Sequence, residues 1–498
     1  MAPRAHLLLV ALLTPAACGL AFPPALARAQ TFAEEVAQAS YVEPLVANGE
    51  SDPRAVARRT EEIEIVRQLA RHRGGHAEAI AQIIQMSRSF DVATAAEMID
   101  ELAAAHLRAG DLNLAAEARR VLAEQYPGTP RAQDSLLWLV RLYSSSEMLH
   151  AHRQTSQAAL DMLRQLPPNA DVSKARTNAA VRRERRKPGV RADGDQTAAP
   201  YAIHLATQAM DRHPELADNA AIAYQRAIAA RLAGQQKQAQ AFLSPLKHRR
   251  GGDPWGDCAR MEAWIESGDK ERSPKLTAAC VFADHPPQLD GVLTEPFWQT
   301  ALPLPLRPSA APAANSPAVQ PAAYDRPASI APAATPTPPA GQVQFAYDRE
   351  YLYLAVVCEQ APGVRYAAAD GPRPRDAEID AQDHVVVRLD LDRDYATYFE
   401  LFVDSRGCTA DRCWGDSAWN PQWYVAVGEL DPAAAGNWIV EIAIPWKELT
   451  RSPPKSNETW ACSIAHMLPA TATQPPQSWV GPASNAPGPE SFGVIRFE

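Results

Sequence analysis

The pattern of apolar residues changes at about residue 275, and this change constrains the fold more than any other feature of the chain. From Thr60 to about Ser145, apolar residues recur every three or four positions among abundant Ala, Leu, Glu and Arg, which is the period of amphipathic helices. From Leu276 onward, apolar runs are short and separated by clusters of Gly, Pro, Asn and Asp, which is typical of a β-sandwich. The sequence therefore predicts a multidomain α + β protein, with an α-helical repeat domain at 30–272 and an antiparallel β-sandwich at 275–498.

Length and charge agree with two large soluble units. A chain of 498 residues exceeds one ordinary hydrophobic core. Its net charge of -9 gives no basic footprint, so nucleic acid is not an expected partner. After the first 29 residues, no apolar stretch approaches the roughly 18 to 20 residues that a membrane-spanning helix needs, so no transmembrane segment is predicted.

The first 29 residues have the pattern of a secretory signal peptide. Arg4 and His6 precede the apolar run 7–13, and small residues at 27–29 offer a cleavage point. This pattern predicts an exported, bacterial-type protein that is periplasmic, held at the cell surface or secreted. Cys18 hints at lipoprotein processing, but Pro15 stands where a large aliphatic residue is usual, so lipidation stays open.

Two segments of the helical half resemble tetratricopeptide repeats. Gly110 lies between two amphipathic segments and Pro127 follows the second, and Gly234 repeats the glycine position in a weaker copy. An irregular helical bundle is the alternative. A basic run near 182–200 is interpreted as a solvated linker, and contact with an anionic polymer or membrane surface is the other interpretation.

The C-terminal half contains eight candidate strands. One insertion, 303–341, holds eleven prolines, and proline at this density cannot join a sheet interior, so a disordered surface loop is predicted. The candidate strands are Val343–Tyr347, Tyr351–Cys358, His384–Leu391, Ala396–Val403, Trp423–Val427, Trp438–Ile444, Trp460–Met467 and Gly493–Phe497.

The order of motifs over 276–498 resembles carbohydrate-binding module family 9, a family with a DOMON-like sandwich fold. The motifs are Leu289–Leu293 with Phe297–Trp298, Phe345–Asp348, Tyr351–Val356, Asp383–Asp390, Trp438–Trp446, Trp479 and Phe492–Phe497. The resemblance implies a sandwich that holds the end of a sugar chain between two tryptophans. Trp479 matches the second tryptophan, whereas the segment 376–382, aligned with the first, has no aromatic residue.

A different aromatic stretch offers a second candidate sugar site. Trp414, Trp419 and Trp423 lie within ten residues of one another, and rings projecting from a loop would form a stacking platform. The alternative is that the three rings pack beneath the loop as a small core. Polar partners for sugar hydroxyls would be Asp404, Arg406, Asp416 and Asn420.

Two further features concern metals and disulfides. Asp390, Asp392 and Asp394 alternate in a predicted turn, where their carboxylates could converge on calcium; a solvated acidic turn is the alternative. No other cofactor is predicted. Cys408 and Cys413 flank a short polar stretch and are the candidate disulfide of an exported chain.

No catalytic motif is found, so the protein is predicted not to be an enzyme, and any activity would be accessory to glycoside hydrolysis. The predicted function is binding of an extracellular polysaccharide or glycan by the sandwich, with the helices as a scaffold. The alternative is a protein-interaction scaffold in the envelope, whose helices recruit a protein partner. A haem site at His466 and Met467 is disfavoured, because adjacent strand residues point to opposite faces.

Overall fold

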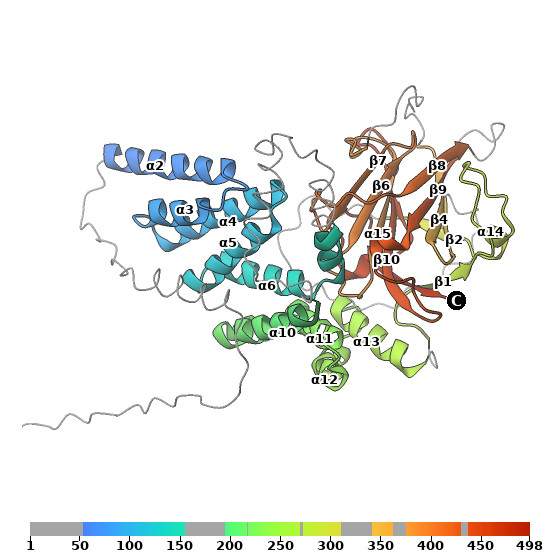
Figure 1. Cartoon of the computed structure of the whole chain (residues 1–498), viewed down its shortest axis with the longest axis horizontal. Helices are drawn as coiled ribbons and strands as arrows, with labels where there is room; N and C mark the ends of the chain where they lie inside the picture. The colour runs from blue at the N-terminus through green and yellow to red at the C-terminus, as the bar shows by residue number, and fades with distance from the viewer. Residues whose placement is uncertain are drawn as a thin grey trace, which may run out of the picture. The chain divides into compact units, whose positions relative to one another are not determined.

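The computed structural model describes residues 53–154, 195–309, 341–361, 375–429 and 437–498, apart from 217 and 269–271 (Figure 1). The predicted leader with Cys18 and residues 182–194 of the predicted basic linker lie outside these residues. Residues 195–200 of that linker instead form the start of helix α10 (Asp195–Arg212). None of the described helices is long and apolar enough to cross a bilayer.

The N-terminal half is helical, as predicted. Helix α4 packs against α5 and α11 packs against α12, each pair being joined by a short turn. Gly110 and Gly234, with φ of 67° and 73°, lie in these two turns. Their assignment to tetratricopeptide repeats stays a prediction. The helices are α2 (Pro53–His72), α3 (Ala79–Ser87), α4 (Val92–Arg108), α5 (Leu112–Gln125), α6 (Pro130–Ser144), α10 (Asp195–Arg212), α11 (Ala220–Leu232), α12 (Gln236–Lys247) and α13 (Pro254–Ser267).

Side-chain caps explain where several of these helices begin. Asp91, Asp111 and Thr129 each accept a backbone N–H from the first turn of the helix that follows. Such caps satisfy amide groups that have no partner inside the helix. A further short helical segment, 146–154, begins after Ser145, whose hydroxyl accepts the N–H of Met148 at 3.0 Å.

The C-terminal half is a β-sandwich. One sheet runs β7-β6-β5-β10-β12-β1, and the other runs β8-β9-β4-β3 with β1 and β2 at its edge. Most pairs are antiparallel, but β1 pairs in parallel with both β12 and β3. The strands are β1 (Thr277–Phe282), β2 (Leu304–Pro308), β3 (Gly341–Tyr347), β4 (Tyr351–Glu359), β5 (His384–Asp390), β6 (Phe399–Asp404), β7 (Thr409–Cys413), β8 (Tyr424–Glu429), β9 (Asn437–Pro445), β10 (Thr459–Met467), β11 (Gln477–Ser478) and β12 (Gly493–Phe497).

All eight predicted strands form, which confirms the fold class. The predicted insertion is shorter than expected: residues 304–308 form β2, with Leu304 opposite Val343 in β3. Leu306 of this strand is 2% exposed, and the burial of its side chain in the core outweighs the unfavourable effect of the two prolines in the strand. The rest of the predicted loop, 310–340, lies outside the described residues.

The sandwich core continues into the helical half. Inward side chains of β4 and β5, such as Leu354 and Val387, share one buried cluster with Leu139 of α6 and Met148 of the segment 146–154. A second cluster joins Tyr224 of α11 to the sandwich. The helices are therefore packed directly on the sandwich through apolar contacts, which the sequence patterns did not indicate.

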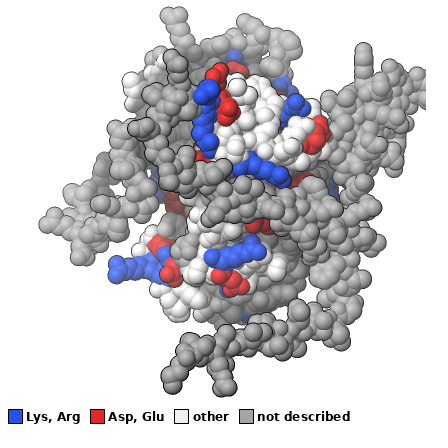
Figure 2. All heavy atoms as spheres, turned by 90° about the vertical axis from the view of Figure 1, so that its left-hand side faces the viewer, with Lys and Arg blue, Asp and Glu red and all other residues white. Residues whose placement is uncertain are grey.

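Charged side chains on the outer helices are paired. Arg67 lies 2.8 Å from Glu97 and 3.0 Å from Glu101, and Arg71 lies 2.9 Å from Glu101. Figure 2 shows acidic and basic groups interspersed with uncharged surface where described residues are visible. That described face therefore offers no large basic patch for an anionic polymer.

Gly291 and Gly428 bring two backbones into close approach. Gly291 has a φ of +82°, and a Cβ added to it would lie 2.5 Å from the backbone nitrogen of Gly428. Its own N–H donates to Glu441 Oε2 at 2.8 Å. Only glycine combines this left-handed conformation with room for the neighbouring strand.

We expect Gly291→Ala to lower the free energy of unfolding by about 2 to 3 kcal/mol, from the left-handed strain and the overpacking together. Urea unfolding followed by tryptophan fluorescence measures this. Gly252→Ala is the matched control: its φ is also positive, at +86°, but nothing lies within 4 Å of the added Cβ. Equal losses in both variants would contradict the close-approach argument.

Candidate functional site

An aromatic cleft lies on the outer face of the sheet that contains β4, β9 and β8. Tyr353, Ala443 and Tyr424 are paired in register across these strands, and Tyr351 lies two residues before Tyr353 on the same face. The small side chain of Ala443 lies between Tyr353 and Tyr424, so the sheet surface is recessed between the two rings. The cleft has a volume of about 780 Å³, within the range of small-molecule sites.

The aromatic rings that line the cleft differ in how far they are exposed. Tyr353 is buried, and its ring stacks at 5.9 Å on that of Tyr351. Tyr424 is 49% exposed and meets Tyr351 edge-on at 6.3 Å. Phe282, 46% exposed, lines another part of the cleft. Open apolar ring faces therefore remain available to a ligand.

The β3–β4 turn positions these rings. Asp348 Oδ1 accepts the N–H groups of Glu350 and Tyr351, and its Oδ2 accepts the Tyr353 hydroxyl at 2.7 Å. Burial and this carboxylate raise the pKa of Tyr353, so its phenol stays protonated as the donor. The exposed polar side chains that line the cleft are Asp284, Arg349 and Glu350.

The tryptophan predicted from the family resemblance is covered. Trp479 is 4% exposed, and its ring lies 5.6 Å from Phe345 in the sandwich core. A Cβ on Gly493 would touch the Trp479 ring at 2.8 Å, so close packing of β12 requires this glycine. Trp479 in this position packs the core and offers no open face for stacking.

The stretch 414–423 packs largely against the rest of the chain. Trp414 stacks at 5.5 Å on Trp138 of α6. Trp419 is 1% exposed, stacks at 4.4 Å on Phe399 and donates its indole N–H to Gln154. Trp423 is half-buried and donates to Asp411. The arrangement matches the alternative of a small core and adds contacts with the helical half.

The polar residues predicted beside these tryptophans are dispersed. Asp404 is buried, and its carboxylate accepts hydrogen bonds from the Arg406 guanidinium and from the N–H of Cys408. These bonds close the β6–β7 turn. Asp416 accepts the N–H of Ala418. Asn420 is exposed. The structure therefore gives Asp404, Arg406 and Asp416 roles in holding turns.

The prediction of a disulfide between Cys408 and Cys413 is wrong. Cys408 and Cys413 are both buried free thiols. Residues 409–413 form β7, and about 3.3 Å per residue separates the two Cα atoms by roughly 16 Å, far beyond the ~4.4–6.8 Å that a disulfide allows. Cys413 instead contacts the sulfur of Met148 at 3.4 Å.

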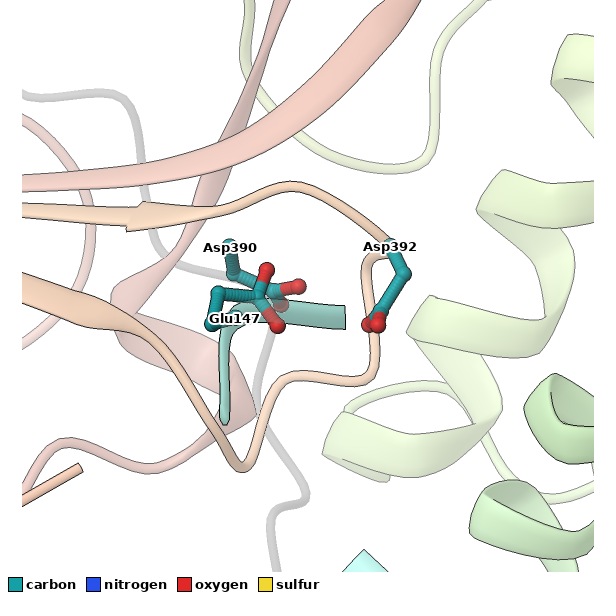
Figure 3. A group of neighbouring side chains, drawn as sticks. All are labelled: Glu147, Asp390 and Asp392. Carbon is teal, nitrogen blue, oxygen red and sulfur yellow. The ribbon is translucent and has the colours of Figure 1, made fainter. Parts of the chain in front are cut away.

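The acidic turn after β5 is buried beneath the helical half rather than solvated. Asp390 accepts the N–H groups of Asp394 and Tyr395, and Asp392 Oδ2 accepts the N–H of Ser146 at 2.7 Å. Glu147, which the sequence analysis missed, accepts the N–H of Leu391. Figure 3 shows Glu147, Asp390 and Asp392 with their carboxyl groups turned toward a common region.

Ligand oxygens of Glu147, Asp390 and Asp392 all lie within 4.8 Å of one another. Asp394 has a separate role: its carboxylate accepts the N–H groups of Ala396 and Thr397, both at 2.7 Å. Burial and the neighbouring carboxylates raise the pKa of Glu147 and Asp390 well above the usual range. Burial, and to a smaller extent the neighbouring Asp392 carboxylate, raises the pKa of Asp394 to about 7.

A buried ion-pair network lies beside this cluster. Glu262 of α13 is bound by Arg231 of α11 and, at 2.7 Å, by Arg393 of the acidic turn. Arg231 also donates to the carbonyl oxygen of Asp392. Burial alone would raise the pKa of Glu262, but the two guanidinium groups outweigh it and lower the pKa to about 2.

No protein-family model and no curated protein matches the chain. Among solved structures, the chain is similar to a carbohydrate-binding module of family 9 from Caldicellulosiruptor kristjanssonii in complex with cellotriose. The identity is 15% and the TM-score 0.30, over 45% of this chain and 94% of that one. The same module in complex with glucose gives 14% identity and a TM-score of 0.30, over 45% and 96% of the two chains.

Proposed function

We propose that this protein is an exported, non-catalytic carbohydrate-binding protein whose sandwich binds a glycan in the tyrosine cleft. The observation that carries the proposal is the row Tyr353–Ala443–Tyr424 with Tyr351 beside it. Aromatic faces can pack on the C–H faces of a pyranose, and nearby polar groups can bond its hydroxyls. Export is supported by the leader pattern of residues 1–29.

The cleft supplies both kinds of contact. Tyr424 and Phe282 are each nearly half exposed, so a ligand would bury apolar ring surface already facing solvent. Asp284, Arg349 and Glu350 are exposed along the same cleft. Carboxylates accept hydrogen bonds from sugar hydroxyls and a guanidinium donates them, so the set fits a polyhydroxylated ligand.

The helical half is proposed to be a scaffold on which the sandwich is mounted. Its packing against the sandwich through α6, α11 and the segment 146–154 supports this role. A protein partner bound by the helices is the alternative function, and the glycan experiment below separates the two.

Removal of one ring tests the site. We expect Tyr424→Ala to weaken glycan binding about tenfold or more, because loss of a buried aromatic contact costs roughly 1.5 to 3 kcal/mol. Tyr424→Phe keeps the ring and should retain most of the binding. The measurement is retention of the full chain on a polysaccharide panel and a glycan array, followed by affinity electrophoresis with each polymer that binds.

Leu302→Ala is the control for loss of exposed apolar surface, since Leu302 is 67% exposed and does not line the cleft. Retention that is equal in wild type and Tyr424→Ala would move the sugar site elsewhere on the chain. Failure to bind any glycan would contradict carbohydrate binding and favour the scaffold with a protein partner.

A further inference from the structure

The acidic turn 390–394 and Glu147 come from opposite halves of the chain and meet in the interior. Asp390 ends β5, Asp392 lies in the turn that follows, and Glu147 belongs to the helical segment 146–154 (Figure 3). All three side chains are buried, with Glu147 and Asp390 0% exposed and Asp392 5% exposed. Such a concentration of carboxylates away from water requires compensation.

The nearby arginines compensate only part of this buried negative charge. Arg231 and Arg393 both bind Glu262, and Arg141 faces Asp394. Those three cations oppose five carboxylates, namely Glu262 and Asp394 together with Glu147, Asp390 and Asp392. When all five carboxylates are ionised, the excess of two negative charges equals the charge of one divalent cation.

One ligand position is left open. Asp392 Oδ1 is buried and makes no hydrogen bond, although Oδ2 of the same carboxylate is bound by Ser146. A buried polar atom without a partner calls for an explanation, and a bound ion is one. Each oxygen of Asp390 accepts only one N–H group in this structure, and a carboxylate oxygen has a second lone pair to offer.

We propose that Glu147, Asp390 and Asp392 bind a calcium ion that ties the helical half to the sandwich. Oxygens on opposite sides of a Ca²⁺ ion can lie about 4.6 to 5.2 Å apart, from bond lengths of roughly 2.3 to 2.6 Å. The ligand oxygens lie within 4.8 Å of one another, which fits this span. Calcium is preferred to magnesium because Mg²⁺ keeps several waters and this cluster is enclosed by protein.

The geometry gives the ion a structural role. The N–H groups of Ser146 and Leu391 already donate across the same contact, to Asp392 and Glu147 respectively. An ion held by both sides would add bonds to this contact and neutralise the repulsion within it. Calcium binding should therefore stabilise the folded chain in proportion to the logarithm of the free calcium concentration.

The test uses the full chain after treatment with EGTA and desalting. Isothermal titration with CaCl2 should show one site, and the unfolding temperature should rise on addition of calcium more than on addition of magnesium. Glu147→Gln, which keeps the side-chain shape, should weaken calcium binding at least about 100-fold, the upper end of the loss seen for an outer-shell partner. In EGTA this variant should unfold at the same or a higher temperature than wild type, since it removes a buried carboxyl group from beside Asp390 and Asp392.

Glu448→Gln is the matched control: Glu448 is also mostly buried and lies beside segment 146–154, where it accepts from Gln154 at 3.2 Å. It should bind calcium like wild type. Asp392→Asn provides a second variant, with the same expected loss as Glu147→Gln, should either protein fold poorly. Wild type without a calcium response, or equal calcium binding by all variants, would overturn the proposal.

Hydrogen exchange separates this site from a surface calcium site. Amides of 146–154 and 390–397 should exchange more slowly with calcium than with EGTA, and no such change should occur in Glu147→Gln. Slowing confined to other segments would place the ion elsewhere and reject the bridging role.

Discussion

Replacing Glu262 with alanine should lower the free energy of unfolding by about 3 to 5 kcal/mol, the usual loss when one partner of a buried ion pair is removed. Glu262 is 3% exposed and is bound by both Arg231 and Arg393. Its removal leaves two partly buried guanidinium groups without their carboxylate. Urea unfolding of the full chain at pH 7 measures the difference.

Glu266→Ala is the control on the same helix. Glu266 is exposed and bonds Gln240 at 3.0 Å, so its loss should cost no more than about 0.5 kcal/mol. Similar losses for the two variants would show that the ion pairs contribute little beyond helix propensity.

The pH dependence gives a second readout of the same network. The pKa of Glu262 is lowered from 4.5 to about 2, so its contribution is fully present above pH 4.5 and is lost as the pH falls through 2. The stability difference between wild type and Glu262→Gln should therefore shrink as the pH is lowered from 5 to 2. A difference that is constant over this range would contradict the ion-pair explanation.

Local patterns in the sequence predicted the elements of the fold well. Alternation of apolar residues gave all eight candidate strands, and three- and four-residue spacing with glycine turns gave the helix pairs. The strands β1, β2, β7 and β11 were not among the candidates. The strand β7 was missed because its sequence, Thr-Ala-Asp-Arg-Cys, has no apolar alternation. It forms because it pairs with β6, with Phe399 opposite Cys413, and such long-range pairing leaves no local signal.

The sites depend on long-range contacts, and the sequence predicted them less well. Asp390 and Asp392 were identified by spacing, but nothing local indicates that Glu147 joins them from the helical half. Tyr351 and Tyr353 were recognised only as part of a candidate strand, and the cleft depends on a register that places Tyr424 and Ala443 beside them. Once the strand order is known, a small residue such as Ala443 between two aromatic positions on neighbouring strands indicates a cleft.

Replacing Trp419 with alanine is expected to cost about 3 to 5 kcal/mol of stability, the range for deleting a large buried aromatic side chain. Trp419 is 1% exposed, stacks on Phe399 at 4.4 Å and bonds Gln154 at 2.9 Å. Trp423→Ala should cost less, because Trp423 is only half-buried. Thermal and urea unfolding of both variants measure the two losses.

The same pair of variants distinguishes a core role from a sugar-binding role for this stretch. If Trp419 and Trp423 formed a stacking platform, both variants would keep wild-type stability and lose glycan retention. The packing against Phe399 and Gln154 predicts the opposite for Trp419: a large loss of stability, with glycan retention per folded molecule unchanged below the unfolding temperature. Trp419→Phe, which keeps an aromatic ring against Phe399 but loses the bond to Gln154, should recover part of the stability. The cleft of Tyr351 and Tyr424 would then remain the site at which ring removal changes binding without changing folding.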